Sequence, residues 1–489
     1  RLPDGTVVGA WQTDDPDVEM PSALKPLAVR WTKLLLPSVP RHALVPAPQS
    51  FKVSQRPLPP EGYRLRIRDG KVEIEAADEA GRFYANVTLG QLGANPPDLE
   101  IEDAPTYRWR GLHFDSARHF FTVQEVKRFI ELMASLKFNV LHWHLTDDQG
   151  WRLPSTKYPK LNTVAATRTA KKGVFRSFRD VVNGEIGPQF YTEEELKEVI
   201  AFAAAHHVTI VPEVEMPGHS VALIRAYPEL TCFGKLTSNY LTNDWNTTGT
   251  VKSVCPGKAA TLQFFKDVLD EVVRVFPDET VHIGGDECNQ GDWAHCPDCQ
   301  AVMKAHGLKT THELQSWFMK QVVDHLTAKG KKALGWDEIL EGGLPEGAKV
   351  MSWRGSKGGI AAAKAGVDAV MCPEEFCYFD FNQDLPDDPQ VYPTLWGSVL
   401  PVEKVYRFDP AEGVPTADRT HILGGQGNNW SEYTWNEYDL DWKVWPRACA
   451  LAEVFWTGEK RPGFADFKKR METHRKRLLA QGVNCAPLE

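Results

Sequence analysis

Two adjacent acidic residues, Asp286 and Glu287, follow a short apolar run and two glycines, and carboxyl groups are suited to acid–base hydrolysis. Neighbouring side chains of a strand point to opposite faces, so adjacent carboxylates act together only where the backbone departs from strand geometry. Gly284 and Gly285 allow that departure. A pair this close favours one protonated carboxyl group beside one ionised carboxylate. On its own, an Asp-Glu pair is also compatible with a simple helix N-terminus.

The same pair is poorly suited to a displacement by a protein nucleophile. That mechanism needs two carboxyl groups about 5 Å apart, one on each side of the bond that breaks. Residues that are adjacent in sequence rarely flank a bond in this way. Asp286 and Glu287 therefore favour a reaction in which the substrate supplies its own nucleophile.

Polar and aromatic residues also follow seven other apolar runs of the chain. Such residues end most strands, but eight ends rich in acids, His, Arg and Trp together predict one polar site with aromatic faces. Buried carboxylates without partners cost too much free energy to serve as packing. Besides the acid pair, these residues are Asp115, Arg118, His119, His142, His144, Asp147, Asp148, Glu213, Glu215, His219, Trp336, Asp337, Glu338, Trp353, Arg354, Tyr378, Asp380, Asn429, Trp430 and Glu432.

His142 and His144 have the spacing of metal ligands at the end of a barrel strand, with Asp147 and His219 as candidate further ligands. A metal-dependent hydrolase is therefore an alternative. This spacing normally belongs to the first strand, however, and later strands here supply Trp, Tyr and Glu instead of further His and Asp. We interpret His142 and His144 as hydrogen-bonding residues and expect no metal ion in the site. His219 follows a Pro-Gly turn and is the better functional candidate.

The chain contains nine cysteines, an odd number that does not indicate a simple disulfide framework. Cys232 and Cys255 are compatible with a bridge across the loop between them. Cys296 and Cys299 closely follow Cys288, which is compatible with a zinc knuckle, but a fourth ligand would have to come from His295 or further away, and a second CxxC motif is absent. A disulfide or free thiols fit this motif better than a metal ion.

From residue 110 onward, eight short apolar runs alternate with helical segments. This alternation predicts a parallel sheet, and eight units predict its closure into a (β/α)8 TIM barrel. An open doubly wound sheet is the alternative, which the lack of a Gly-rich phosphate loop after the first run disfavours. Capping boxes at Thr122, Thr192 and Thr310 predict the starts of three helices. The eight runs are 110–115, 139–145, 208–214, 280–284, 332–336, 348–353, 369–372 and 421–425.

A small α+β domain is predicted ahead of the barrel. Alternating apolar and polar residues at 63–67 and 72–76 predict a β-hairpin with one face in solvent, and residues 80–92 have helical spacing. The sequence before this hairpin is rich in proline and shows little helix or strand periodicity, which predicts an irregular segment. The predicted parts are an irregular segment at 1–43, the small α+β domain at 44–105 and the (β/α)8 catalytic barrel at 106–489.

Composition narrows the class of partner. The net charge of −9, without a stripe of Lys and Arg, argues against nucleic acid. No apolar run reaches the roughly 18–20 residues of a membrane helix, so we expect no membrane span. The chain begins with Arg1, which is compatible with a trimmed chain, and we expect a secreted, periplasmic or cell-surface location.

Residues 281–287, with the sequence VHIGGDE, resemble the site motif of β-N-acetylhexosaminidases of glycoside hydrolase family 20. The resemblance covers nearly everything from residue 44 onward. One departure is Glu215, which stands where the family leads us to expect Asp. Other blocks that match in the family's order are 115–119 (DSARH), 142–152 (HWHLTDDQGWR), 211–219 (VPEVEMPGH), 335–338 (GWDE) and 424–432 (GGQGNNWSE).

The resemblance implies a retaining hydrolysis in which the sugar's own 2-acetamido oxygen attacks the anomeric carbon. It implies that Glu287 is the general acid and later the base, that Asp286 orients the acetamido N–H, and that Tyr378 hydrogen-bonds the acetamido oxygen. The other implied substrate-binding residues are Trp336, Trp353 and Trp430 around the sugar, Arg118, Asp380 and Glu432 at its hydroxyl groups, and Asp147 and His219 in a network that supports Glu287.

The family thus implies an exo-acting enzyme that removes terminal β-linked GlcNAc or GalNAc from glycans, with no cofactor and no metal ion. Two alternatives stay open: a disaccharide-releasing member such as a lacto-N-biosidase, and a catalytically silent glycan-binding protein. The intact acid pair, Tyr378 and Arg118 disfavour the silent protein. The choice between the two sugars is open, and a homo-oligomer is compatible with the sequence.

Overall fold

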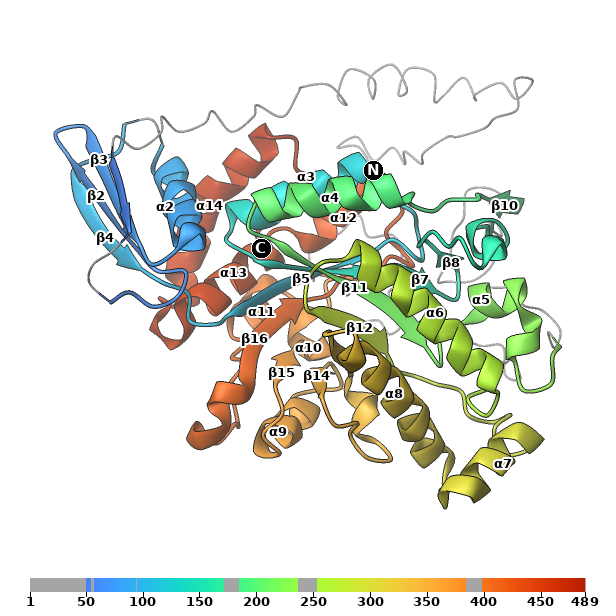
Figure 1. The fold of residues 1–489 in the computed structure, drawn as a ribbon. Coiled ribbons are helices and arrows are strands. Elements are labelled where there is room, and N and C mark those ends of the chain that lie inside the picture. Colours follow the sequence, from blue (N-terminus) through green and yellow to red (C-terminus); the bar gives the residue numbers. More distant parts are fainter. Residues whose placement is uncertain are drawn as a thin grey trace, which may run out of the picture.

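The fold is described from a computed structural model, over residues 50–53, 57–93, 95–170, 184–235, 253–383 and 398–488. The segment at 1–43, predicted to be irregular, lies outside these residues. Figure 1 shows a barrel surrounded by helices, with a small sheet and one helix at its side. The predicted fold class, a small α+β domain followed by a barrel, is confirmed. The boundaries drawn between the predicted parts stay a prediction.

The small domain is a four-stranded sheet with one helix packed on it, and its strand order is β1-β3-β2-β4. The predicted hairpin is β2 paired antiparallel with β3. Tyr63, Leu65 and Ile67 alternate along β2 and are buried beneath Tyr84 and Leu89 of the helix, because one face of the sheet must be covered. The elements are β1 (Ser50–Val53), β2 (Tyr63–Arg68), β3 (Lys71–Ala76), α2 (Glu79–Leu92) and β4 (Leu99–Asp103).

Eight parallel strands close into the barrel in the order β5-β6-β11-β12-β13-β14-β15-β16, and β16 pairs with β5 to complete the ring. The strands coincide with the eight predicted runs, so the barrel is confirmed and the open doubly wound sheet is wrong. Strands covered by helices on one side and filled by side chains on the other are apolar throughout. Their bounds are β5 (Trp109–Asp115), β6 (Val140–His144), β11 (Thr209–Met216), β12 (Thr280–Gly284), β13 (Lys332–Trp336), β14 (Ala348–Ser352), β15 (Ala369–Met371) and β16 (Ile422–Gly427).

Helices between the strands cover the outside of the barrel (Figure 1). The predicted capping boxes at Thr122 and Thr192 are both complete. At Thr310 only half of the box forms, because the carboxylate of Glu313 accepts the backbone N–H of Lys309 instead. The helices are α3 (Val123–Ser135), α4 (Glu193–Ala205), α5 (Val221–Ala226), α6 (Ala259–Val275), α7 (Pro297–His306), α8 (Thr311–Ala328), α9 (Lys357–Lys364), α10 (Glu374–Cys377), α11 (Val402–Tyr406), α12 (Glu437–Val444), α13 (Arg447–Thr457) and α14 (Phe464–Ala480), and the short strands are β7 (Thr146–Asp147), β8 (Gly150–Trp151), β9 (Arg168–Ala170) and β10 (Gly184–Ile186).

Hydrogen bonds and an ion pair, several of which involve aromatic side chains, join the small domain to the barrel. Trp456 of α13 lies in the core of the small domain, and its Nε1 donates to Asp103 Oδ2 at 2.8 Å. Arg110 of β5 is buried and donates to Glu61 Oε2 at 2.7 Å and to the Tyr84 hydroxyl at 3.0 Å. A buried guanidinium needs acceptors, and here the small domain supplies two of them. The contacts therefore fix the small domain against the barrel.

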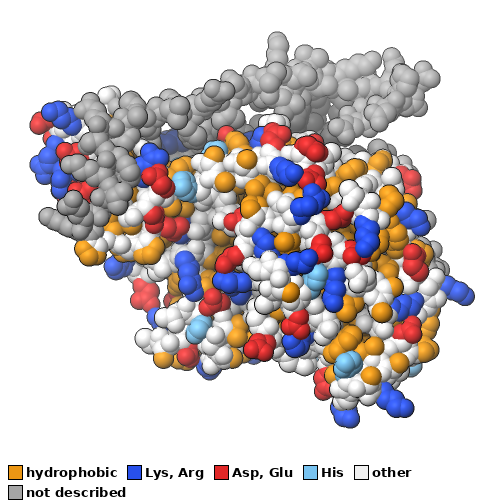
Figure 2. Space-filling view, in the orientation of Figure 1, with side chains coloured by type: hydrophobic (Ala, Val, Ile, Leu, Met, Phe, Trp, Pro, Cys, Tyr) orange, Lys and Arg blue, Asp and Glu red, His pale blue; other side chains and the backbone are white. Residues whose placement is uncertain are grey.

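The surface carries charges of both signs. Figure 2 shows acidic and basic side chains mixed over the described part of one face. Such a mixture gives little net attraction for a polyanion. Within the described ranges, no helix is long and apolar enough to cross a membrane.

Candidate active site

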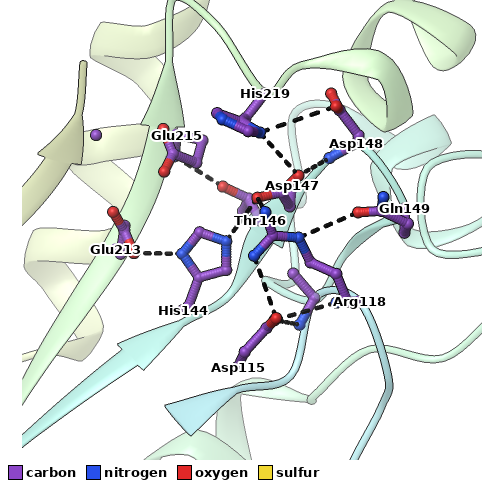
Figure 3. Close-up of polar contacts among 12 residues, drawn as sticks. Asp115, Arg118, His144, Thr146, Asp147, Asp148, Gln149, Glu213, Glu215 and His219 are labelled. Carbon is purple, nitrogen blue, oxygen red and sulfur yellow. Dashed lines mark hydrogen bonds and ion pairs between the residues drawn. The ribbon is translucent and has the colours of Figure 1, made fainter. Parts of the chain in front are cut away.

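The carboxyl ends of the barrel strands, or the loops that follow them, carry every site residue that the sequence predicted. Figure 3 shows a central part of this group, with side chains from β5, β6 and β11 and from their following loops pointing toward one another. Parallel strands in a barrel all end on the same side, so residues far apart in sequence meet there.

Asp286 and Glu287 lie where the backbone leaves β12. Gly284 and Gly285 have φ values of 64° and 107°, and Glu287 has a φ of 42°, which is uncommon for a residue with a Cβ atom. A Cβ atom on Gly284 would lie 1.9 Å from Oε2 and 3.2 Å from Cα of the buried Glu215, which together with the positive φ favours glycine. The side chain of Asp286 is 11% exposed, whereas the side chain of Glu287 is 37% exposed. One carboxylate thus lies against the protein and its neighbour is open to an incoming molecule.

His219 connects the acid pair to the interior. Its Nε2 lies 3.4 Å from Asp286 Oδ2 and 3.5 Å from Glu287 Oε2, and its Nδ1 lies 3.2 Å from Asp147 Oδ1. Burial would lower the pKa of His219, but the charges of Asp147 and Asp286 hold this pKa well above its usual value. A protonated imidazole can donate on both sides. His219 therefore holds the two catalytic candidates together and links them to Asp147.

Arg118 is the cationic centre of the site. Its guanidinium lies 2.8 Å from Asp147 Oδ2, 3.2 Å from Asp115 Oδ2 and 3.6 Å from Glu432 Oε1. Burial would raise the pKa of Asp147, but the charges of Arg118 and His219 hold this pKa well below its usual value. The guanidinium also lies 4.8 Å from the ring centroid of Trp430. Arg118 thus fixes three carboxylates and an aromatic ring, and Figure 3 shows two of these carboxylates, Asp115 and Asp147.

Beneath the site, the buried carboxylate of Glu213 takes contacts from several rings. Its oxygens lie 2.8 Å from His282 Nδ1, 3.1 Å from His142 Nε2 and 2.8 Å from Trp336 Nε1, and it also hydrogen-bonds His144 Nδ1. Burial would lower the pKa of His144, but Glu213 raises it to about 10, whereas burial lowers the pKa of His142 to about 4. His142 and His144 are hydrogen-bonded residues, as interpreted from the sequence.

Glu213→Ala is expected to lower the free energy of unfolding by about 3–5 kcal/mol, because removing one partner of a buried ionic network leaves the others unpaired. Urea unfolding followed by Trp fluorescence measures the change. Glu198→Ala, which removes an exposed carboxylate paired with Lys127, is the matched control and should cost no more than about 1 kcal/mol. Equal effects of the two substitutions would contradict this role of Glu213.

Aromatic rings form one side of the site. The ring centroids of Trp336 and Trp430 are 5.7 Å apart, those of Trp430 and Tyr378 are 6.2 Å apart, and those of Tyr378 and Trp353 are 6.0 Å apart. Burial, and then the charges of Cys372 and Asp380, raises the pKa of Tyr378 well above its usual value, so its hydroxyl group stays a donor. The structure therefore brings these four rings together, and one of them, Tyr378, carries a phenolic donor.

Asp380 and Glu432 form the acidic edge of the site near Arg118. Burial, and then the charge of Glu432, raises the pKa of Asp380 to about 7. Burial also raises the pKa of Glu432, although Arg118 opposes this shift. Among the described residues, no side chain or backbone group donates a hydrogen bond to Asp380 Oδ1. A buried acceptor of this kind is available to a hydroxyl group of a ligand.

Glu338 belongs to the site although the family resemblance did not imply a substrate-binding role for it. Its Oε2 accepts the Nε1–H of Trp353 at 3.0 Å. Burial, and then the charges of Asp286 and Asp337, raises the pKa of Glu338 to about 9. The signal was present in the Gly-Trp-Asp-Glu block, but the sequence does not show that Glu338 lies near Asp286 and orients a tryptophan.

A closed barrel that gathers acids, a phenol and tryptophans at the carboxyl ends of its strands is the construction of the barrel hydrolases. The particular family follows from comparison with known proteins. The model of the catalytic domain of glycosyl hydrolase family 20 matches residues 107–459, and the model of domain 2 of the same family matches residues 25–104. The chain belongs to glycosyl hydrolase family 20.

Several relatives match over most of this chain. A β-hexosaminidase of Porphyromonas gingivalis is 40% identical over 88% of the chain, and one of Akkermansia muciniphila is 35% identical over 86% of the chain and 84% of its own length. The chain spans 55% of the length of the Porphyromonas relative. The solved exo β-N-acetylglucosaminidase of Vibrio harveyi, in complex with N-acetylglucosamine, is 33% identical with a TM-score of 0.79, over 89% of this chain and 69% of that chain.

Proposed function

We propose that this protein is an exo-acting β-N-acetylhexosaminidase. It hydrolyses terminal, non-reducing β-linked GlcNAc or GalNAc residues of glycans, with retention of configuration and with the substrate's acetamido group as the nucleophile. The observation that carries the proposal is the geometry of the acid pair: Asp286 and Glu287 lie within 3.5 Å of one nitrogen of His219, on one side of the site. Adjacent carboxylates that meet at one nitrogen are poorly placed to lie on opposite sides of a bond, which supports a nucleophile supplied by the substrate.

In the first step, the acetamido oxygen forms a bond to the anomeric carbon while the bond to the leaving oxygen breaks. Glu287, the more exposed acid of the pair, gives its proton to that leaving oxygen. Asp286 accepts the acetamido N–H and stabilises the positive charge of the oxazolinium ring. Tyr378, which stays protonated, donates to the acetamido oxygen and fixes its direction of attack. In the second step, Glu287 takes a proton from water, which opens the ring from the opposite face and restores the β configuration.

The remaining side chains bind the sugar. Trp336, Trp353 and Trp430 supply apolar faces for the acetamido methyl group and the sugar ring. Asp380 and Glu432 accept from hydroxyl groups on the non-reducing side, and Arg118 holds Glu432 in place and donates to the same region. Carboxylates at that edge would stop a longer chain, which supports release of single sugars from a chain end.

The comparisons support the same substrate class. The relatives from Porphyromonas and Akkermansia are named β-hexosaminidases, and the Vibrio harveyi enzyme is named an exo β-N-acetylglucosaminidase and was solved with N-acetylglucosamine bound. A family in which such names recur favours the hexosaminidase over a silent glycan-binding protein. A secreted, periplasmic or cell-surface location is proposed with it, because glycans of this kind are exposed there.

Hydrolysis of the p-nitrophenyl β-glycosides of GlcNAc, GalNAc and glucose tests the proposal. Both acetamido sugars are expected to be cleaved, with a β anomer as the first product seen by proton NMR. The glucoside, which lacks the acetamido nucleophile, is expected to react at least about 10²-fold more slowly. Equal rates for glucose and GlcNAc, or an α anomer as the first product, would contradict the mechanism. No turnover of the single sugars, with turnover of a disaccharide glycoside, would identify a disaccharide-releasing enzyme instead.

A further inference from the structure

Four cysteines that the proposed reaction does not use converge beside the barrel. Cys232 follows the short 3-10 helix Pro228–Leu230, Cys255 precedes α6, and Cys296 and Cys299 lie at the start of α7. All four are buried and their Sγ atoms lie within 4.8 Å of one another. They come from three separate segments of the chain, so the barrel has to fold before they meet.

The distances between the sulfur atoms match those around a tetrahedral ion. Cys255 Sγ lies 3.5 Å from Cys299 Sγ and 3.6 Å from Cys296 Sγ, and Cys232 Sγ lies 3.8 Å from Cys299 Sγ. A zinc ion bound to four thiolates at about 2.3 Å separates its sulfur atoms by about 3.8 Å. A disulfide would place two of them about 2.05 Å apart, and all nine cysteines of the chain are free.

The surroundings of the cluster are built like those of a closed structural metal site. Apolar side chains, among them Trp293 and Leu314, bury it, and Trp293 Nε1 donates to the carbonyl oxygen of Val254 at 3.0 Å. Gly257 passes so close to α7 that a Cβ atom would lie 2.3 Å from the nitrogen of Cys299. Lys258 Nζ donates to the carbonyl oxygen of Thr231 at 2.6 Å and so holds the backbone next to Cys232. An apolar shell and closely packed backbone segments suit an ion held by four thiolates.

We propose that Cys232, Cys255, Cys296 and Cys299 bind one Zn²⁺ ion as a structural site. Four sulfur ligands fill the tetrahedron and leave no position for a substrate, so the site is not catalytic. Each thiol loses its proton as its sulfur binds the ion. This proposal departs from the expectation of no metal, because the sequence showed only one CxxC motif. The other two ligands are Cys232 and Cys255, which the sequence suggested as a candidate disulfide, in place of the Cys288 and His295 of the predicted zinc knuckle.

The proposed ion holds the segment after the acid pair in place. Cys296 and Cys299 end the connection that leads from Glu287 to α7, and Cys232 and Cys255 belong to the connection between β11 and α6. Two hydrogen bonds join the same connections, from Ser253 Oγ to the carbonyl oxygen of Asn289 at 2.6 Å and from Trp293 Nε1 to that of Val254 at 3.0 Å. Within the connection after β11, the Val254 N–H donates to the carbonyl oxygen of Pro217 at 3.0 Å. The ion would therefore tie the loop after β12 to the loop after β11, which carries His219.

Metal analysis and thiol counting on the wild-type chain test the proposal directly. The protein is purified without added metal or reductant, its zinc is measured by mass spectrometry, and its thiols are titrated after denaturation with a chelator. The expected result is about one zinc ion per chain together with nine free thiols, since four thiolates saturate one ion. Nine thiols without metal would overturn the proposal, as would five thiols without metal, which indicate two disulfides among the four.

Variants assign the ligands independently of activity. Cys299→Ser and Cys255→Ser are each expected to lose the bound zinc, whereas Cys288→Ser, the fifth cysteine of this region, keeps it. Cobalt added to the zinc-depleted wild type is expected to give the visible absorption of a tetrahedral tetrathiolate site, and Cys288→Ser should give the same spectrum. Retention of zinc by both ligand variants, or a six-coordinate cobalt spectrum of the wild type, would contradict the proposed site.

Discussion

Glu287→Gln is expected to reduce kcat on β-linked GlcNAc disaccharides by about 10²–10⁴-fold, because the sugar leaving group then receives no proton from the enzyme. The effect on kcat/KM for the p-nitrophenyl glycoside should be much smaller. A nitrophenolate leaves without a proton, so the bond breaks even when residue 287 is an amide. Steady-state kinetics with both substrates measure this contrast, which a role limited to binding would not produce.

The position of Glu287 allows Gln to replace it without a change in packing. Glu287 is the more exposed member of the pair and its carboxylate lies 3.5 Å from His219 Nε2, so an amide of equal size fits the same space. Glu346→Gln, at an exposed position ahead of β14, is the matched control and should keep wild-type kinetics on both substrates. Equal losses on the disaccharide and on the aryl glycoside would show that Glu287 is not the acid of the first step.

Asp286→Asn is expected to lower kcat by about 10²–10³-fold on both substrates, including the aryl glycoside. Asp286 acts on the acetamido group and not on the leaving group, so a good leaving group gives no rescue. The amide also removes the negative charge that would face the oxazolinium ring, and it removes one of the charges that raise the pKa of His219. The pair of variants thus separates two roles for adjacent residues.

Inhibitor binding adds a readout that does not depend on turnover. A thiazoline analogue of the oxazoline intermediate is expected to lose far more affinity for Asp286→Asn than the product GlcNAc does, because the charge is needed for the intermediate. Asp324→Asn, which removes an exposed carboxylate paired with Lys320 on α8, is the control and should bind both molecules like the wild type. Equal losses for the two molecules would make Asp286 a binding residue only.

Local patterns of the sequence were enough to predict the positions of the barrel strands. Each strand is covered on both sides, so it appears in the sequence as a short apolar run. Eight such runs that alternate with helices are typical of a closed parallel barrel, which the structure shows. Two capping boxes formed as predicted because their partners are three residues apart. The third formed only in part, because Glu313 found another donor next to the box, in Lys309. Gly284 and Gly285 before the acid pair also carried their own signal, since both have positive φ values, which glycine adopts without strain.

The partners of the polar residues were decided by the tertiary structure. The sequence named Asp286, Glu287, Tyr378 and the tryptophans, but not that His219 lies between both acids and Asp147. The sequence did not predict that Glu213 makes polar contacts with side chains from three strands, or that Glu338 lies beside Asp286. The four cysteines are the clearest case, because their spacing along the chain resembles no complete metal motif and they become neighbours only in the folded chain. Strand and helix periodicity is a local property, whereas these contacts depend on the closure of the barrel and on the paths of its loops.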